Sequence, residues 1–176
     1  MRLRKVFVAT LAAALVAGVG FTSKASRLFQ TPPGSLQLSD KVECFYAAGT
    51  RVSAAPSYPE PREIHVDGDV FIRQPASGAP LIVRTRLLVL TARGPAEFRV
   101  TARSNETGEQ VEVLEGTVEA RKAYASPFSE PDRLASGEVS MVNRTIDLME
   151  KEKTDVMALR AWRRALIASI APPDRR

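Results

Sequence analysis

The amino-acid sequence predicts an all-β domain that follows an N-terminal membrane helix and precedes a C-terminal amphipathic helix. Three features carry this prediction. Residues 6–21 form an uncharged apolar run, residues 35–144 contain short runs in which apolar and polar side chains alternate, and after residue 154 apolar side chains recur every three or four positions. A period of two is typical of strands, and a period near 3.6 is typical of helices.

The apolar run follows a basic stub, residues 1–5, which contains Arg2, Arg4 and Lys5. A helix over residues 6–21 would span ~24 Å, which suits a signal-peptide core or a short anchor in a hydrocarbon layer of ~30 Å. Because basic flanks stay in the cytoplasm, the chain after Phe21 should lie outside. We expect a single-pass anchor, with cleavage at Ser23-Lys24-Ala25 and release of the domain as the alternative.

The β-domain is expected over residues 35–144, after a polar linker, residues 22–34, that ends in Pro32-Pro33-Gly34. Four glycines open strand runs at intervals of 21 to 26 residues, namely Gly68, Gly94, Gly116 and Gly137. This rhythm suits a roll or short solenoid, and it suits a twisted β-sandwich almost as well. The alternating residues expected to face the core are Ile64, Val66, Val70, Ile72, Val111, Val113, Val118, Ala120, Val139 and Met141.

Residues 145–176 are expected to form a helix and a tail, with Thr154 as the N-cap and Pro172-Pro173 as the stop. The apolar stripe of this helix consists of Val156, Leu159, Trp162, Leu166 and Ile170. Such a stripe usually packs on its own domain. Because the other side is basic, a contact with a partner stays open, and the candidate partner-binding residues are Arg160, Trp162, Arg163 and Arg164.

The charge distribution argues against nucleic-acid binding. The chain carries +5 overall, but residues 1–5 contribute +3 and residues 160–176 contribute +4, so residues 6–159 carry −2. Nucleic-acid binding needs positive charge on the folded surface, often interleaved with aromatic rings. The middle of the chain has neither, and no nucleic-acid partner is expected.

The sequence offers little catalytic chemistry. Cys44 and His65 are each the sole residue of their type, so neither a cysteine metal cluster nor a second imidazole can be assembled. The segment His65-Val66-Asp67-Gly68-Asp69 holds two carboxylates, too few for calcium. Asp-Gly between alternating apolar residues predicts a hairpin turn there instead. We expect a protein that is not an enzyme, without catalytic residues, bound metal or cofactor.

The strand segments occur in an order that resembles the FecR family, the extracytoplasmic domain of bacterial transmembrane anti-sigma regulators. The resemblance covers roughly residues 30–144, through segments that include REIHVDGDVFI, APLIVRT, RGPAEFRV, VEVLEGTVEA and RLASGEV. It implies a FecR-type β-domain in the periplasm, on a bacterial inner-membrane anchor, with a role in cell-surface signalling. The residues that match the family pattern are Arg62, Gly68, Asp69, Phe71, Pro80, Val83, Thr85, Gly94, Phe98, Val100, Gly116, Val118, Leu134, Gly137 and Glu138.

The sequence also departs from the family pattern. Only five residues precede the apolar run, so a cytoplasmic sigma-binding domain is not expected, and Ala165 replaces a glycine of the segment that opens the family's last domain. The implied partners are the inner membrane and another envelope protein, either a receptor or a signalling partner. The alternative is a domain that binds polysaccharide or another ligand, or an envelope scaffold. Polysaccharide binding would need an aromatic row drawn from Phe45, Tyr46, Tyr58 and Phe71.

Overall fold

The structure is a computed structural model that describes residues 31–75 and 79–170. The apolar run and most of the expected linker lie outside these residues, as does the expected proline stop. No helix of the described residues is both long and apolar enough to span a membrane. The elements are β1 (Gly34–Gln37), β2 (Glu43–Tyr46), β3 (Arg51–Ala54), β4 (Glu63–Gln74), β5 (Leu81–Arg84), β6 (Leu88–Ala92), β7 (Ala96–Ala102), β8 (Gly108–Glu115), β9 (Thr117–Lys122), β10 (Asp132–Ala135), β11 (Glu138–Asn143), β12 (Leu148–Lys153) and α1 (Val156–Ile170).

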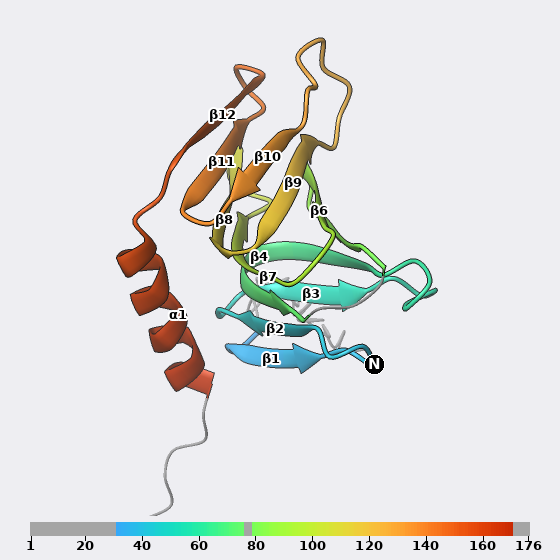
Figure 1. Cartoon of the computed structure of the whole chain (residues 1–176), viewed down its shortest axis with the longest axis vertical. Helices are drawn as coiled ribbons and strands as arrows, with labels where there is room; N and C mark the ends of the chain where they lie inside the picture. The colour runs from blue at the N-terminus through green and yellow to red at the C-terminus, as the bar shows by residue number, and fades with distance from the viewer. Residues whose placement is uncertain (1–30, 76–78, 171–176) are drawn as a thin grey trace, which may run out of the picture.

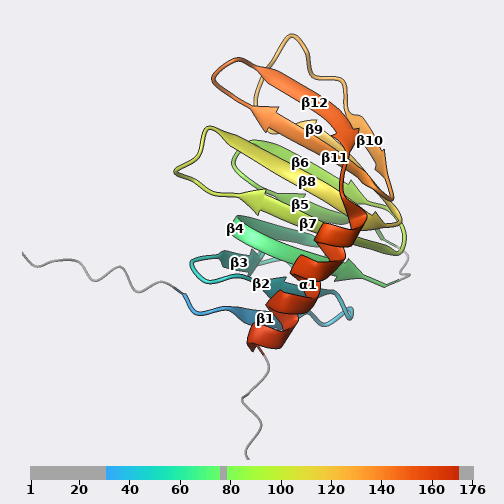
Figure 2. The same ribbon diagram turned by 90° about the vertical axis from the view of Figure 1, so that its left-hand side faces the viewer.

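The strands form two layers that share β4 (Figures 1 and 2). The first layer has the order β1-β2-β4-β7-β8-β11-β12, and the second has the order β3-β4-β5-β6-β9-β10. Every pair is antiparallel except β4 with β5. At the far end β10 approaches β11, where Ser140 Oγ donates to Asp132 Oδ2 at 2.7 Å, so the sheet nearly closes into a barrel. A solenoid would stack successive turns through parallel pairs, whereas all but one of these pairs are antiparallel, so the domain is a mostly antiparallel, nearly closed barrel-like sheet.

The core lies between the two layers and follows the predicted alternation for most strands. Val111, Val113, Val118 and Ala120 are fully buried. The prediction fails in β11, where Ser140 and Val142 face the core and Met141 lies on the opposite face. Both sets alternate equally well in the sequence, so the period alone does not tell which set is inside.

The predicted hairpin at Asp67-Gly68 is wrong, because β4 continues through it. Residues before Gly68 pair with β3 and β5, and residues from Gly68 onward pair with β2 and β7. Gly68 has a φ of +131°, and a Cβ there would lie 2.7 Å from Thr50 Cα. The Thr50 hydroxyl accepts from Asp69 N at 2.9 Å and donates to Asp69 O at 3.2 Å. The glycine therefore bends one strand from the second layer into the first.

The β-region extends beyond the expected end at residue 144, because β12 covers Leu148–Lys153. The following element is a helix, as predicted, but its N-cap is Asp155 and not Thr154. Asp155 Oδ1 accepts from Met157 N at 2.9 Å and from Ala158 N at 3.0 Å. Leu159 and Leu166 are buried, so the apolar stripe packs on its own domain, as expected.

Substituting Gly68 with valine should destabilise the domain by about 3 kcal/mol or more, because a side chain must adopt a positive φ and displace Thr50 backbone. Urea denaturation followed by circular dichroism measures this change. Gly94→Ala is the matched control, since a Cβ at Gly94 meets no atom within 4 Å, and it should stay within about 1 kcal/mol of the wild type. Equal stability of both variants would refute the bend as the constraint.

Candidate functional site

The outer face of the first layer divides into a half that α1 covers and a half that stays open. Cross-strand pairing places Phe71, Arg99 and Glu112 in one row under the helix. It places Thr101, Gln110, Met141 and Glu150 in the next row, across β7, β8, β11 and β12. Figure 2 shows α1 crossing the strands in the direction of β1, below the β11–β12 hairpin. The open half is therefore framed by the helix on one side and by strand ends on the other.

The covered half has an apolar centre. Phe71 and Leu114 from the sheet and Leu159 and Leu166 from the helix are all buried there. Partly buried residues surround this cluster, namely Phe45, Ala47, Val156, Trp162 and Ile170. Burial of such side chains contributes roughly 1.5–3 kcal/mol each, which is enough to fix a helix of four turns on a sheet.

Arg99 connects the strands and the helix through charge. Its guanidinium donates to both carboxylate oxygens of Asp69 at 2.9 and 2.8 Å and to Glu112 at 3.3 Å. It also lies 3.9 Å from the centroid of the Trp162 ring. Burial acts to lower the pKa of Arg99, but hydrogen bonds and charge from Asp69 and Glu112 raise it overall. Arg99 therefore stays a cation held between β4, β8 and α1.

The four candidate partner-binding residues do not share one surface. Trp162 lies against Arg99, and Arg163 pairs with Glu97 and lies 5.5 Å from the centroid of the Phe71 ring, so both face the sheet. Arg163 was expected on the polar side of the helix and instead contributes to helix packing. Arg160 and Arg164 are exposed, and their role in partner binding stays a prediction.

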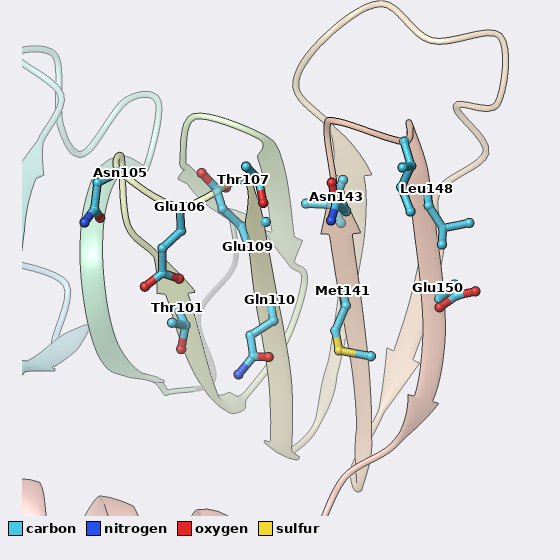
Figure 3. Close-up of a pocket in the computed structure, with 13 residues that line it drawn as sticks. Thr101, Asn105, Glu106, Thr107, Glu109, Gln110, Met141, Asn143, Leu148 and Glu150 are labelled. Atoms are coloured by element: carbon cyan, nitrogen blue, oxygen red, sulfur yellow. The ribbon is translucent and has the colours of Figure 1, made fainter.

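The open half forms a groove of about 830 Å³ beside the β11–β12 hairpin (Figure 3). Its floor is the row of Thr101, Gln110, Met141 and Glu150. The β7–β8 loop forms one wall with Asn105, Glu106 and Thr107, and the hairpin forms the other with Asn143, Ile146 and Leu148. This groove is polar and acidic on one wall and apolar on the other.

A second hollow, of about 590 Å³, lies on the other side of the same hairpin. Ile146 and Leu148 line it as well, facing Phe128 from the β9–β10 loop. Phe128 is 76% exposed, Ile146 65% and Leu148 39%. The sequence pattern does not reveal this surface, because its residues come from two turns; the only signal is an isolated large apolar residue within each polar turn.

A buried lysine fixes the two turns relative to each other. Lys122 Nζ donates to Asp147 Oδ1 and to the Asp147 carbonyl, both at 2.8 Å, and to Ser126 Oγ at 3.0 Å. Ser126 Oγ donates to Asp147 Oδ2 at 2.8 Å and accepts from Phe128 N at 3.1 Å. The hydrogen bond from Lys122, then that from Ser126, lowers the pKa of Asp147. Asp147 thus remains ionised at neutral pH and holds both turns.

Glu109 is a buried carboxylate behind the first groove. Its Oε2 accepts from Thr85 Oγ1 and, at 3.0 Å, from Leu87 N, while its Oε1 has no hydrogen-bond partner among the described residues. Arg86 Nε lies 3.7 Å from Oε1. Burial raises the pKa of Glu109 above its ordinary value. The carboxylate therefore connects the β5–β6 turn to β8. Its charged form is disfavoured by burial, so ionisation of Glu109 costs folding free energy.

The family-pattern residues serve the fold in the structure. Six are fully or almost fully buried in the core or under α1: Phe71, Val83, Phe98, Val100, Val118 and Leu134. Gly94, Gly116 and Gly137 lie in turns, Gly68 forms the bend, and Pro80 precedes β5. The remaining four bind neighbouring segments: Arg62 to Asp40, Asp69 to Arg99, Thr85 to Glu109, and Glu138 to Lys153.

Comparison with solved structures gives the nearest indication of function. Two crystal structures of what is described as "a putative anti-sigma factor from Parabacteroides distasonis" match this chain with a TM-score of 0.65 each. They are 26% and 25% identical to it, and each match covers 76% of this chain. The match spans only 61% of the Parabacteroides chains. No protein-family model and no curated protein matches the sequence.

Truncating the helix stripe should lift α1 from the sheet. Leu159→Ala and Leu166→Ala should each destabilise the domain by about 2 kcal/mol, because both side chains are buried under the helix. Trp162 is the only tryptophan in the chain, so its fluorescence reports helix docking, and the double variant should shift the emission to longer wavelength. Met157→Ala, on the exposed side of α1, is the control. An unchanged emission maximum in the double variant would contradict this assignment.

Replacing Glu109 with glutamine should change how stability depends on pH. A carboxyl whose pKa is raised by folding contributes stability below its unfolded pKa and loses that contribution as the pH rises through the folded value. The wild type should therefore gain stability relative to Glu109→Gln as the pH falls from 7 to 4.5. Urea midpoints of both proteins at each pH measure the difference. A difference that is constant with pH would show that Glu109 titrates equally in both states.

Proposed function

We propose that this chain is a membrane-tethered, periplasmic FecR-like module that acts in envelope signalling by binding another protein. The observation that carries the proposal is the fold match with an anti-sigma-type protein at 26% identity over 76% of the chain. The order of the family-pattern segments supports it, because those residues occupy core, turn and clamp positions of this fold. The basic stub and the apolar run of residues 6–21 support the tether.

Binding is favoured over catalysis by the surroundings of the two residues most suited to nucleophilic chemistry. Cys44 is fully buried in the core, and this burial, together with the charge of Asp40, raises its pKa to about 12. Its thiolate is therefore scarce at neutral pH. His65 is exposed on β4, 3.3 Å from Glu63, and faces away from the core that holds Cys44.

The four aromatic residues that polysaccharide binding would need do not form an exposed row in the structure. Phe71 is buried under α1, and Phe45 packs in the same cluster. Tyr46 and Tyr58 are partly buried against the core. Glycan-binding faces usually expose stacked aromatic rings, so these four positions favour a structural role over sugar recognition.

The tether is tested by fractionation of the bacterium. The full chain should remain with the inner membrane after carbonate extraction and should be digested by protease only when the outer membrane is opened. A matched variant in which residues 1–21 are exchanged for a cleavable signal peptide should become soluble in the periplasm. Recovery of the full chain in the cytosol would reject the proposal.

The signalling role is tested by transcript profiling of a deletion strain. Loss of the gene should change the expression of a limited regulon by at least threefold, and the tethered full chain should restore it. A Gly68→Val variant, whose fold we expect to be disrupted, should fail to restore it and serves as the negative control. Profiles that are identical with and without the gene, in the presence of an envelope stimulus, would count against signalling.

A further inference from the structure

We propose that the two hollows flanking the β11–β12 hairpin form one docking surface for a protein segment that carries both apolar and cationic side chains. The inference rests on the proposed function, which requires a protein partner, and adds the surface and the chemistry of that partner. The surface, called the hairpin tip below, is defined by Phe128, Ile146 and Leu148 at its centre and by Glu130, Asp132 and Glu150 at its rim.

The centre of the hairpin tip is apolar and open to solvent. Phe128, Ile146 and Leu148 are large apolar residues with exposed side chains, and all three line the same hollow. Single exposed apolar residues are common on soluble proteins, but a group of them around one depression marks an interaction site. Met149 lies in the same lining and extends the apolar surface toward β12.

The apolar residues are held in position before any partner arrives. Lys122 is almost fully buried, and it ties Asp147, next to Ile146, to Ser126, which fixes the backbone of Phe128. Asp147 also adopts a φ of 50°, which is uncommon for a residue other than glycine. The network directs two exposed side chains from separate turns toward one hollow. A surface that is already ordered loses less conformational entropy on binding.

The acidic residues at the rim of the hairpin tip indicate that its occupant is positively charged. Lys122 neutralises Asp147 and Arg103 neutralises Glu106, which leaves Glu130, Asp132 and Glu150 without a cationic partner among the described residues. Glu130 and Glu150 are exposed, and Asp132 is half-buried. A partner that buries the apolar centre must approach these carboxylates. Lysine or arginine beside its apolar anchors would satisfy them, whereas an acidic segment would be repelled.

The position of the hairpin tip favours a protein over the membrane as its occupant. The first described strand, β1, and the C-terminal end of α1 lie at one end of the long axis, and the β9–β10 and β11–β12 turns lie at the other (Figures 1 and 2). A domain tethered through the segment before β1 would therefore present the hairpin tip away from the bilayer. The tip is then placed to meet another protein of the envelope.

The test measures binding of two synthetic peptides to the full chain in lipid nanodiscs. The probe is a fluorescein-labelled amphipathic 18-mer of leucine and lysine, and its matched control has glutamate at every lysine position. Fluorescence anisotropy should show saturable binding of the cationic peptide at least tenfold tighter than binding of the anionic one. The double variant Phe128→Ser with Ile146→Ser should lower the affinity for the cationic peptide at least tenfold, because it removes two apolar side chains from the centre of the tip. Both side chains are exposed, so the variant should still fold.

A further double variant tests the acidic rim, and two others control for non-specific attraction. Met157→Ser with Ile167→Ser removes exposed apolar residues from α1 and should leave binding unchanged. Glu130→Lys with Glu150→Lys should lower the affinity for the cationic peptide at least tenfold. Glu60→Lys with Glu115→Lys changes exposed carboxylates away from the tip and should alter that affinity less than twofold. Equal binding of the two peptides, or loss of binding in both control pairs, would overturn the proposal.

Two other occupants would also overturn it. Sedimentation velocity that shows a dimer dissociated by Phe128→Ser would assign the tip to a second copy of the chain. Ile146→Cys, labelled with a fluorophore while Cys44 stays buried and unreactive, reports contact with lipid, and quenching by brominated lipids would assign the tip to the membrane. If peptide binding fails while deletion still alters the regulon, only the docking surface is wrong. If binding holds while the regulon is unchanged, only the signalling role is wrong.

Discussion

The fold depends on one strand that serves two layers. β4 forms ladders with β3 and β5 up to Asp67 and with β2 and β7 from Gly68 onward. The strand changes layer at Gly68, whose backbone adopts a positive φ that side chains oppose. Thr50 holds the bend through two hydrogen bonds to Asp69. The alternation of side chains continues through the bend, so Val70 and Ile72 enter the same core as Ile64 and Val66.

The residue after the bend organises the outer face. Strand alternation places Asp69 on the side of β4 that faces Arg99, and the Arg99 guanidinium in turn contacts Glu112 and Trp162. Thr154, which follows β12, donates to Glu112 at 2.7 Å just before the helix begins. A buried charge that lost its partner would carry a large desolvation penalty, so these groups depend on one another. The position of α1 on the sheet is therefore fixed in part by the charged group that begins at Asp69, the residue next to the bend.

Periodicity was sufficient to predict the β-class, most core positions and the face of the C-terminal helix, because each reflects burial on one side of a regular element. β12 was missed because the edge sequence LMEKEK is mostly exposed and contributes only Met149 to the core, so it shows no alternation. The hairpin prediction at Asp67-Gly68 failed because this dipeptide indicates only a positive φ. Both a hairpin turn and a bend within a strand use that backbone conformation. The candidate site could not be predicted, since Phe128 and Ile146 meet only through the Lys122 network.

The two halves of the outer face differ in how their charges are balanced. Under the helix, Arg99 pairs with Asp69 and Glu112, and Arg163 pairs with Glu97, so both guanidinium charges are balanced by carboxylates. On the open half, Glu150 lies beside Met141 in the cross-strand register and forms no salt bridge with a described residue, since the neighbouring Lys151 pairs with Glu138. The exposed apolar side chains and unpaired carboxylates of this surface contribute little to folding, because they make few contacts with their own domain. The proposed partner would supply both the apolar contact and the positive charge that this surface lacks.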